Sequence, residues 1–327
     1  MKTRVVRIAA VAALQLAACG TLQAREGDAT QLLAKAMQAT HKLNYSGTFV
    51  YRHGNVSETS RITHFVDGGK EYEHLEVLDG SPREVVREGD EVTCYMPESR
   101  TVFIERRSER GTFPAILPAS LGNLGEYYSI VRGQPARVAG FETQAVLLEP
   151  RDEYRYAHQF WIDNASGLLV KATLSDGRHE LLESLVFTEL KVGIPADHAR
   201  IRVRLKTSED WKVHHVASRE SGRVEEGNWL FKNGLPGFRR TAGMRRQVKL
   251  NSPESLHFVF SDGLAAISVF IEPNDTPGNK TDNQVVNMGA INAYRRIVGD
   301  FQILVMGEVP PVAVKRLGDG IEWRKRQ

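Results

Sequence analysis

The sequence predicts an α+β fold: a large curved antiparallel sheet with helices on one face, followed by a smaller α/β domain. Short stretches of alternating apolar and polar residues recur between Gly-rich turns from residue 45 to residue 190. An amphipathic helical pattern precedes them, and a length of 327 residues favours two domains over one. We expect roughly ten strands in the first sheet, and a sheet that wide must curl.

Residues 75–97 give the clearest strand pattern, which predicts three short strands joined by two tight turns. The turns fall at 79–82 and 88–90, where Gly adopts positive φ without steric cost and Pro fixes φ. Alternate residues from Val92 to Met96 share one face. Such a meander is not stable alone, so it requires neighbouring strands or a helix on its apolar face.

The first predicted element is a helix over residues 29–43, with Asp28 as its N-cap. Its apolar residues form one stripe at helical spacing, so this helix is expected to cover one face of the sheet. The strands expected to form that sheet, beside the meander, are 45–53, 58–66, 70–78, 100–106, 127–132, 136–139, 141–149, 154–162, 168–174 and 180–190.

Residues 111–124 interrupt the strand pattern, because two prolines stand among apolar side chains. We expect a short helix or an ordered loop whose side chains lie against the sheet. Its apolar residues include Phe113, Ile116, Leu117 and Leu121. Two interpretations stay open at this point: a plain packed connection, or a mobile cover over a pocket.

The chain changes character at residues 196–227, where charged runs and Gly-rich turns replace the strand pattern. We therefore assign residues 25–195 to the first domain, 196–227 to a linker and 228–327 to the second domain. A final helix is expected at 312–317, after two prolines. The strands predicted for the second domain are 239–250, 255–260, 265–272 and 295–306, the last with a turn at 299–300.

Residues 1–24 have the pattern of an export signal, with basic residues ahead of an apolar stretch too short to span a bilayer. Cleavage after Ala24 would release a soluble protein. Alternatively, residues 16–19 resemble a bacterial lipobox, and cleavage there would leave Cys19 lipidated and the protein tethered to a membrane. Either cleavage places the mature chain outside the cytoplasm and leaves Cys94 without a partner for an internal disulfide.

The sequence supports neither catalysis nor a cofactor. It lacks a nucleophile elbow, a phosphate-binding loop and a dinucleotide-binding glycine pattern. His179 and Glu180 begin a run that resembles a zinc-protease helix, but the second His is missing, so we expect no metal site. The net charge of +3 is too small and too dispersed to predict nucleic-acid binding. We therefore predict that the protein is not an enzyme and holds no cofactor.

Several stretches, in this order along the chain, resemble the RseB/MucB family of periplasmic negative regulators of an envelope-stress sigma factor. Each is weak alone, whereas the ordered set is specific and covers most of the chain after the export signal. The stretches are residues 78–89, 154–156 before 161–163, Leu168 with its lysine-bearing strand, 229–230 with 235–238, 261–264 with 268–273, and 307–311.

The resemblance implies a first domain similar to the lipoprotein carriers LolA and LolB, which form a curved half-barrel over helices. It implies a periplasmic protein that binds the periplasmic part of a membrane anti-sigma factor of the RseA/MucA type and shields it from proteolysis. Lipid or lipopolysaccharide fragments would release it, because a ligand that prefers the free form weakens the complex. It leaves open whether the chain forms a homo-oligomer.

On this basis we expect the second domain and its seam with the first to bind the protein partner. The partner-binding candidates are Trp229, Phe238, Asp262 and Leu264, and the lipid-pocket candidates are Phe113, Ile116, Leu117 and Leu121. The alternative function is a periplasmic lipid or lipoprotein carrier, which would need only the first domain. A hydrolase would require a cleft with clustered perturbed polar groups.

Overall fold

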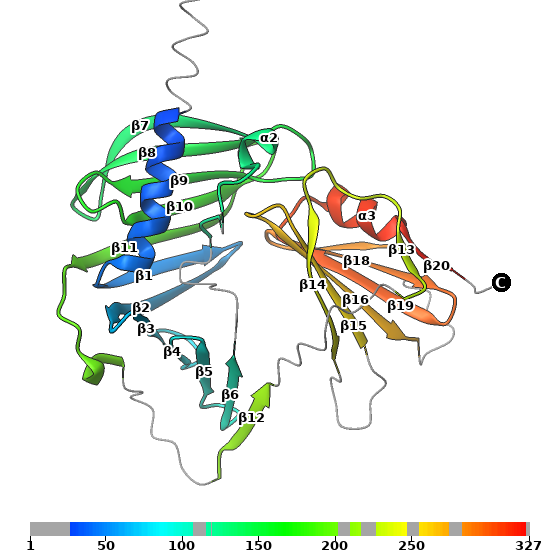
Figure 1. The fold of residues 1–327 in the computed structure, drawn as a ribbon, viewed down its shortest axis with the longest axis horizontal. Coiled ribbons are helices and arrows are strands. Elements are labelled where there is room, and N and C mark those ends of the chain that lie inside the picture. Colours follow the sequence, from blue (N-terminus) through cyan, green and yellow to red (C-terminus); the bar gives the residue numbers. More distant parts are fainter. Residues whose placement is uncertain are drawn as a thin grey trace, which may run out of the picture.

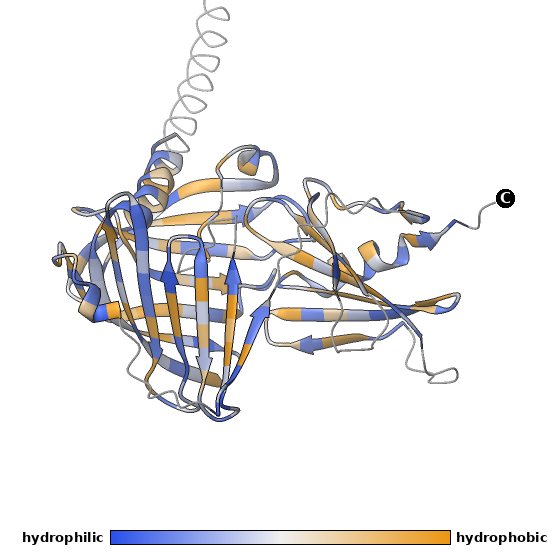
Figure 2. Ribbon diagram, turned by 60° about the horizontal axis from the view of Figure 1, so that its bottom comes forward, coloured by the Kyte–Doolittle hydropathy of each residue, from blue (hydrophilic) through white to orange (hydrophobic). Residues whose placement is uncertain are grey.

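The computed structural model contains a large curved sheet and a smaller sheet, joined by a long connection (Figure 1), and a separate pair of short strands. The structure describes residues 27–106, 116–118, 120–201, 210–216, 227–246, 255–274 and 283–324. Apolar and polar residues alternate along most strands (Figure 2), as a sheet with one buried face requires. Among the described residues, no helix combines the length and the apolar character needed to cross a bilayer.

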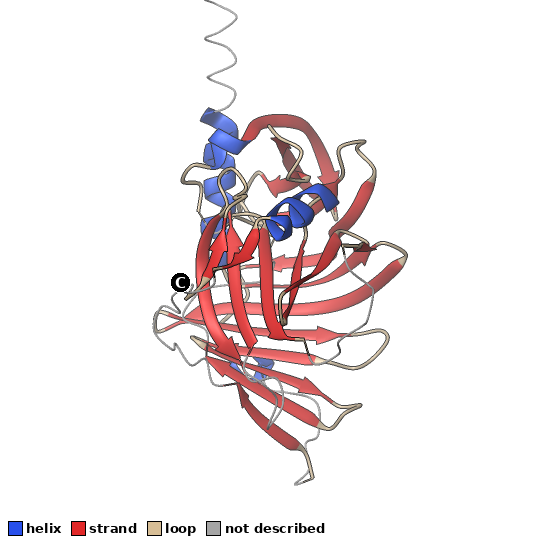
Figure 3. Ribbon diagram, turned by 90° about the vertical axis from the view of Figure 1, so that its right-hand side faces the viewer, coloured by secondary structure: helices blue, strands red, loops and turns tan. Residues whose placement is uncertain are grey.

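The first sheet has twelve strands in the order β12-β6-β5-β4-β3-β2-β1-β11-β10-β9-β8-β7. The meander β1 to β6 therefore runs to one side of β1, while β11 back to β7 runs to the other, and the sheet curls strongly (Figure 3). The strands are β1 (Tyr45–His53), β2 (Val56–Asp67), β3 (Lys70–Val77), β4 (Glu84–Glu88), β5 (Glu91–Met96), β6 (Thr101–Arg106), β7 (Tyr128–Val138), β8 (Phe141–Pro150), β9 (Ala157–Asp163), β10 (Leu169–Ser175), β11 (Leu181–Val192) and β12 (Lys212–Val216).

A helix over residues 27–42 crosses the concave face of this sheet (Figure 1). Its side chains Leu33 and Ala36 are fully buried against Phe160 and Ile162, so the apolar stripe makes the predicted contact with the sheet. The predicted cap is wrong. Asp28 lies inside the helix, and its carboxylate accepts a hydrogen bond from Arg132 Nη1 at 2.5 Å.

Strand β7 is continuous, whereas the sequence predicted two strands, 127–132 and 136–139. The register to β8 shifts between Arg132 and Pro135, so the break in pattern is a β-bulge inside one strand. Because β7 lies at the edge of the sheet, Pro135 can stand in it even though it has no N–H to donate.

The expected linker contributes to the first sheet. After β11, the 3₁₀ helix η1 (His198–Ile201) packs against β3. Strand β12 then pairs in parallel with β6 and forms the edge of the sheet farthest from β7. The chain thus passes from one side of the sheet to the other before it reaches the second sheet. Sequence reasoning missed this strand, because the parallel pairing partner lies about a hundred residues earlier and leaves no local signal.

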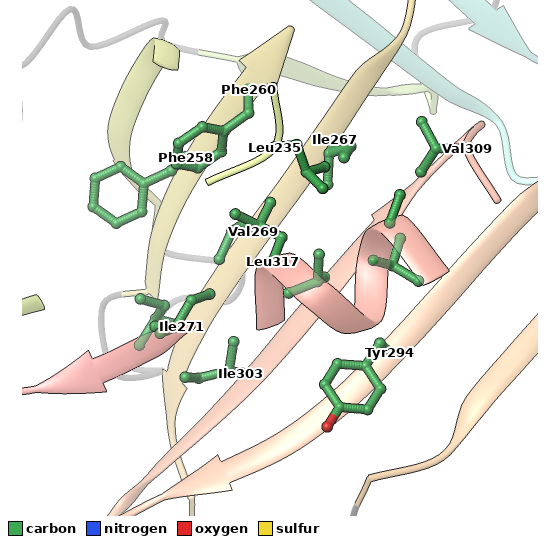
Figure 4. Close-up of a cluster of buried hydrophobic side chains, with 14 of the residues drawn as sticks. Leu235, Phe258, Phe260, Ile267, Val269, Ile271, Tyr294, Ile303, Val309 and Leu317 are labelled. Atoms are coloured by element: carbon green, nitrogen blue, oxygen red, sulfur yellow. The ribbon is translucent and has the colours of Figure 1, made fainter. Parts of the chain in front are cut away.

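The second sheet is smaller and carries one helix, α3 (Pro311–Asp319), on one face. Figure 4 shows labelled side chains such as Phe258, Val269 and Tyr294 converging with Leu317 of α3 to form its core. The strand order is β14-β15-β16-β19-β18-β17, and β13 pairs with β20 separately. These strands are β13 (Trp229–Phe231), β14 (Arg239–Arg246), β15 (Ser255–Ser261), β16 (Ala266–Pro273), β17 (Val285–Met288), β18 (Ile291–Val298), β19 (Phe301–Gly307) and β20 (Ile321–Trp323).

The predicted fold class is confirmed: a large curved antiparallel sheet with a helix on one face, and a smaller sheet with its own helix. Three strands and the end of one helix in the second half of the chain differ from the predictions. Strands β13, β17 and β20 were not predicted as strands, since each has only three or four residues. Helix α3 runs to Asp319, two residues past the predicted end, with Gly320 as its C-cap.

Candidate functional site: the seam between the two sheets

The turn between β8 and β9 joins the two sheets. Residues 154–156, one of the motifs behind the family resemblance, each reach a different part of the second sheet or its helix. Arg155 contacts Asp262, in the loop between β15 and β16. Its two tyrosine neighbours contact residues of α3 and β18. This turn and its partners, together with the cavity beside them, are the candidate functional site, which we call the seam.

Arg155 is the centre of the seam. Its Nε donates to Asp262 Oδ2 at 2.7 Å, and both side chains are 0% exposed. Its other nitrogens donate to the Asp152 carboxylate and to the backbone carbonyl of Pro236. The flat guanidinium also lies between the rings of Tyr127 and Phe238, at 4.7 and 4.8 Å from their centroids. A planar cation with several donors suits such a site, where a Lys ammonium would leave contacts unmade.

Asp262 is held in place from its own loop. Its Oδ1 accepts the backbone N–H groups of Leu264 at 2.9 Å and Ala265 at 2.8 Å, leaving Oδ2 to face Arg155. The hydroxyl of Tyr128 approaches the same Oδ2 at 3.4 Å. Burial, and next the negative charge of Asp262, raise the pKa of Tyr128, so this phenol stays a neutral donor.

The two tyrosines that flank Arg155 extend the contact. Tyr154 accepts a hydrogen bond from Arg316 Nη1 at 2.8 Å, and the same guanidinium lies 5.1 Å from its ring centroid. Tyr156 accepts from the fully buried Asn292 Nδ2 at 2.9 Å, which also donates to the carbonyl of Val309 at 2.8 Å. Because the side chains of Arg155, Asp262 and Asn292 are buried and paired, the seam specifies one arrangement of the two sheets.

Gly237 allows the close approach of the second sheet to Tyr127. Its φ is +77°, and a Cβ built there would lie 2.4 Å from Tyr127 Cε2. We expect Gly237→Ala to lower the free energy of unfolding by about 2–4 kcal/mol, measured by denaturant titration. The matched control is Gly299→Ala, because Gly299 shares the positive φ of +60° with no atom within 4 Å of the added Cβ. Equal losses for the two variants would contradict a steric role for Tyr127.

A small cavity of about 40 Å³ lies beside these contacts. It is lined by residues of the first sheet, both apolar ones such as Phe160 and polar ones such as Thr173 and Ser184. Leu264 of the second sheet and two carboxylates, Glu183 and Glu308, complete the lining. Among the described residues, no three His, Cys, Asp or Glu side chains converge as metal ligands would. Ile116, from the connection before α2 (Leu124–Tyr127), also lines it.

The lipid-pocket candidates fall on this same connection. Ile116, Leu117 and Leu121 are partly buried and pack against the core under helix 27–42. Phe113 lies outside the described residues, as does Cys19. Their roles in binding stay predictions.

The partner-binding candidates divide between the second core and the seam. Trp229 is 2% exposed, inside the core beside Phe301 and Trp323. Phe238 and Asp262 contact Arg155, and Leu264 packs against the core of the first sheet. The structure therefore brings three of the four together at the seam and places the fourth apart from them. Whether they touch a partner stays a prediction.

Sequence reasoning did not give Arg155 a role. The signal was an Arg between two aromatic residues directly before a strand, in a stretch already quoted for the family resemblance. Its partners Pro236 and Asp262 stand in two other quoted stretches, 235–238 and 261–264. Three motifs that were weak separately thus meet at one buried cation.

Two family models match the chain in order. The model of the MucB/RseB N-terminal domain matches residues 28–205, and that of the MucB/RseB C-terminal domain matches residues 223–322. The chain belongs to the MucB/RseB family. Strand β12 lies between the two matched ranges.

Relatives and solved structures agree with this membership. The chain is 28% identical over 298 residues to the sigma factor AlgU regulatory protein MucB of Pseudomonas aeruginosa, covering 89% of each chain. It is 25% identical over 321 residues to the sigma-E factor regulatory protein RseB of Haemophilus influenzae, covering 95% of this chain and 96% of that one. It also resembles a chain in the solved structure of the Pseudomonas aeruginosa MucA/MucB complex, with a TM-score of 0.73 and 25% identity. The match covers 91% of this chain and 100% of that one.

These relatives are regulatory proteins by name, in agreement with the expectation that a MucB/RseB protein is not an enzyme.

Proposed function

We propose that the protein is a periplasmic negative regulator of an envelope-stress response that binds the periplasmic domain of an anti-sigma factor and protects it from regulated proteolysis. The observation that carries this proposal is the match to both domains of the MucB/RseB family, in order and across most of the chain. The MucB relative whose fold it shares was solved in complex with MucA.

The seam supports a binding role that uses both sheets. Its buried ion pair and aromatic contacts hold the two sheets in one arrangement, so a partner that touches both meets a preformed surface. We propose that Phe238, Asp262 and Leu264 support this surface by fixing the seam. Trp229 would support it from within the second core.

A lipid or lipopolysaccharide signal would bind on the concave face of the first sheet. Cross-strand register places Ile62, Leu75, Val85, Cys94 and Phe103 in one row across that face. The row starts fully buried at Ile62 and ends at Phe103, which is 37% exposed, so the face opens toward its outer edge. We propose that Phe113, Ile116, Leu117 and Leu121 form the cover of this pocket.

Phe103 gives a direct test of the lipid proposal. We expect Phe103→Asp to weaken binding of a fluorescent acyl-chain probe about tenfold or more, because a charge would enter an apolar contact. The matched control is Val213→Asp: Val213 is 54% exposed near the same sheet edge, but its register opposite Val102 puts it on the other face. Equal weakening by both variants would contradict binding on the concave face.

The proposed location is the periplasm, reached through the export signal at residues 1–24. The lipid-anchored alternative through Cys19 predicts a mass increase of the mature protein and its recovery with membranes. Self-association into a homo-oligomer also stays a prediction.

The alternative function is a lipid or lipoprotein carrier. The opening of the concave face between Ile62 and Phe103 favours it, since a carrier needs such a face. A carrier does not need the second sheet, so a variant that no longer binds the anti-sigma factor would still bind lipid.

A proteolysis assay tests the protective role. The periplasmic segment of a candidate anti-sigma factor of the RseA/MucA type would be exposed to the site-one protease with and without the purified protein. We expect the protein to slow cleavage at least tenfold, and lipopolysaccharide to restore it. Cleavage at the same rate in all three conditions would contradict the proposal.

A further inference from the structure

Two carboxylates from different sheets line the same seam cavity. Glu183 belongs to β11 of the first sheet, and Glu308 follows β19 of the second. Like charges that face each other across an interface between two bodies oppose closure when both are ionised. The protonation of this pair is therefore coupled to the contact between the sheets.

Glu183 is fixed in its place. The residue is only 8% exposed, and its Oε2 accepts a hydrogen bond from the hydroxyl of Tyr51 at 2.6 Å. Burial and this carboxylate raise the pKa of Tyr51, so the phenol remains a donor throughout the physiological range.

Glu308 is in a different position. The residue is exposed to solvent, yet burial on the cavity side, and then the charge of Glu183, raise its pKa from 4.5 to about 7. Solvent weakens the repulsion between Glu308 and Glu183, so we expect ionisation of Glu308 to destabilise the contact between the sheets only moderately.

The other charged and titratable groups around the cavity do not neutralise the pair. His158 of β9 lines the cavity, and burial lowers its pKa to about 4, so it is uncharged above pH 5. His53 lies beside Tyr51, with ring centroids 5.6 Å apart. Glu58 faces Tyr51 from β2 and is paired with Arg83 at 3.3 Å. None of the described residues that line the cavity is Lys or Arg.

We propose that the Glu183–Glu308 pair makes the seam pH-sensitive: acid closes the contact between the two sheets, and neutral to alkaline pH loosens it. When Glu308 is protonated, the pair carries one negative charge, and the neutral carboxyl can remain beside Glu183. When Glu308 ionises, the two carboxylates repel each other across the interface. The inference depends neither on the partner nor on the lipid.

The direction follows from linkage. Opening the seam would return Glu308 to its ordinary pKa of 4.5, whereas the closed seam raises that pKa to about 7. The closed form thus binds its proton more tightly. The stabilisation is fully present below about pH 4.5, is lost as the pH rises toward about 7, and changes little above that.

Hydrogen–deuterium exchange at matched intrinsic rates tests this inference. Between pH 5 and pH 8, we expect the protection of the backbone amides at residues 151–156 and 289–292 to fall at least about fivefold in the wild-type protein. In Glu308→Gln, which keeps the shape but cannot ionise, we expect a fall of less than about twofold. Glu272→Gln, a substitution elsewhere on the second sheet, should behave as the wild type.

Two outcomes would overturn the proposal. One is an equal fall in wild type and Glu308→Gln; the other is no fall in the wild type. A His53→Gln variant distinguishes Glu308 from His53 as the source of the pH dependence. If His53→Gln lost the pH dependence and Glu308→Gln kept it, the effect would belong to His53. Thermal unfolding at both pH values shows whether each variant is folded.

Discussion

Arg155→Ala is expected to lower the free energy of unfolding by about 3–5 kcal/mol, because removing one partner of a buried ion pair leaves the other charge without compensation. Asp262 is 0% exposed and would lose its donor Nε, and the backbone carbonyl of Pro236 would lose its donor as well. The rings of Tyr127 and Phe238 would also lose the guanidinium between them. Chemical denaturation measures the loss, with the two sheets followed separately where they unfold in separate steps.

The control for this prediction is Arg178→Ala. Arg178 lies 3.6 Å from the carboxylate of Asp176, but its side chain is 80% exposed, so the expected loss is below about 1 kcal/mol. Arg155→Lys keeps the charge and loses the planar geometry, so we expect it to recover only part of the stability. A loss below about 1 kcal/mol for Arg155→Ala would show that the buried pair does not hold the seam.

Trp229→Ala is expected to destabilise the second sheet by about 3–5 kcal/mol, as large-to-small changes of buried aromatic residues do. Trp229 is 2% exposed, and its ring packs edge-on against Phe301 and Trp323 at centroid distances of 5.2 and 4.9 Å. The variant would weaken partner binding through the loss of its fold. The unfolding curve and the affinity for the anti-sigma segment should therefore change together.

Trp323 supplies the comparison. It is 37% exposed and belongs to the same aromatic group, so Trp323→Ala should cost less than half as much as Trp229→Ala. If Trp229→Ala kept its stability and lost the partner, Trp229 would be a direct contact, as its position after the linker first suggested.

The local elements of the fold were predictable from local patterns. The run 75–97 forms β3, β4 and β5 with turns where Gly stands, and Gly80 and Gly89 do adopt positive φ. The helix before the first strand was found from its apolar stripe. These features depend on residues within a few positions of one another, which a sequence displays directly.

The seam could not be assembled from the sequence, because its partners are far apart in the chain. Arg155 and Asp262 are 107 residues apart, and only the docking of two sheets makes them a pair. Strand β12 was missed for the same reason: its partner β6 comes about a hundred residues earlier in the chain, with β7 to β11 between them. The motifs behind the family resemblance marked the right residues but carried no information on their contacts.

The most direct test of the account is a calorimetric titration of the purified protein with the periplasmic segment of its anti-sigma factor, with and without lipopolysaccharide. We predict a complex with a Kd of roughly micromolar or tighter, weakened about tenfold or more by lipopolysaccharide. No binding to the segment, by a folded protein that still binds lipid, would contradict the regulator and leave the carrier as the better account.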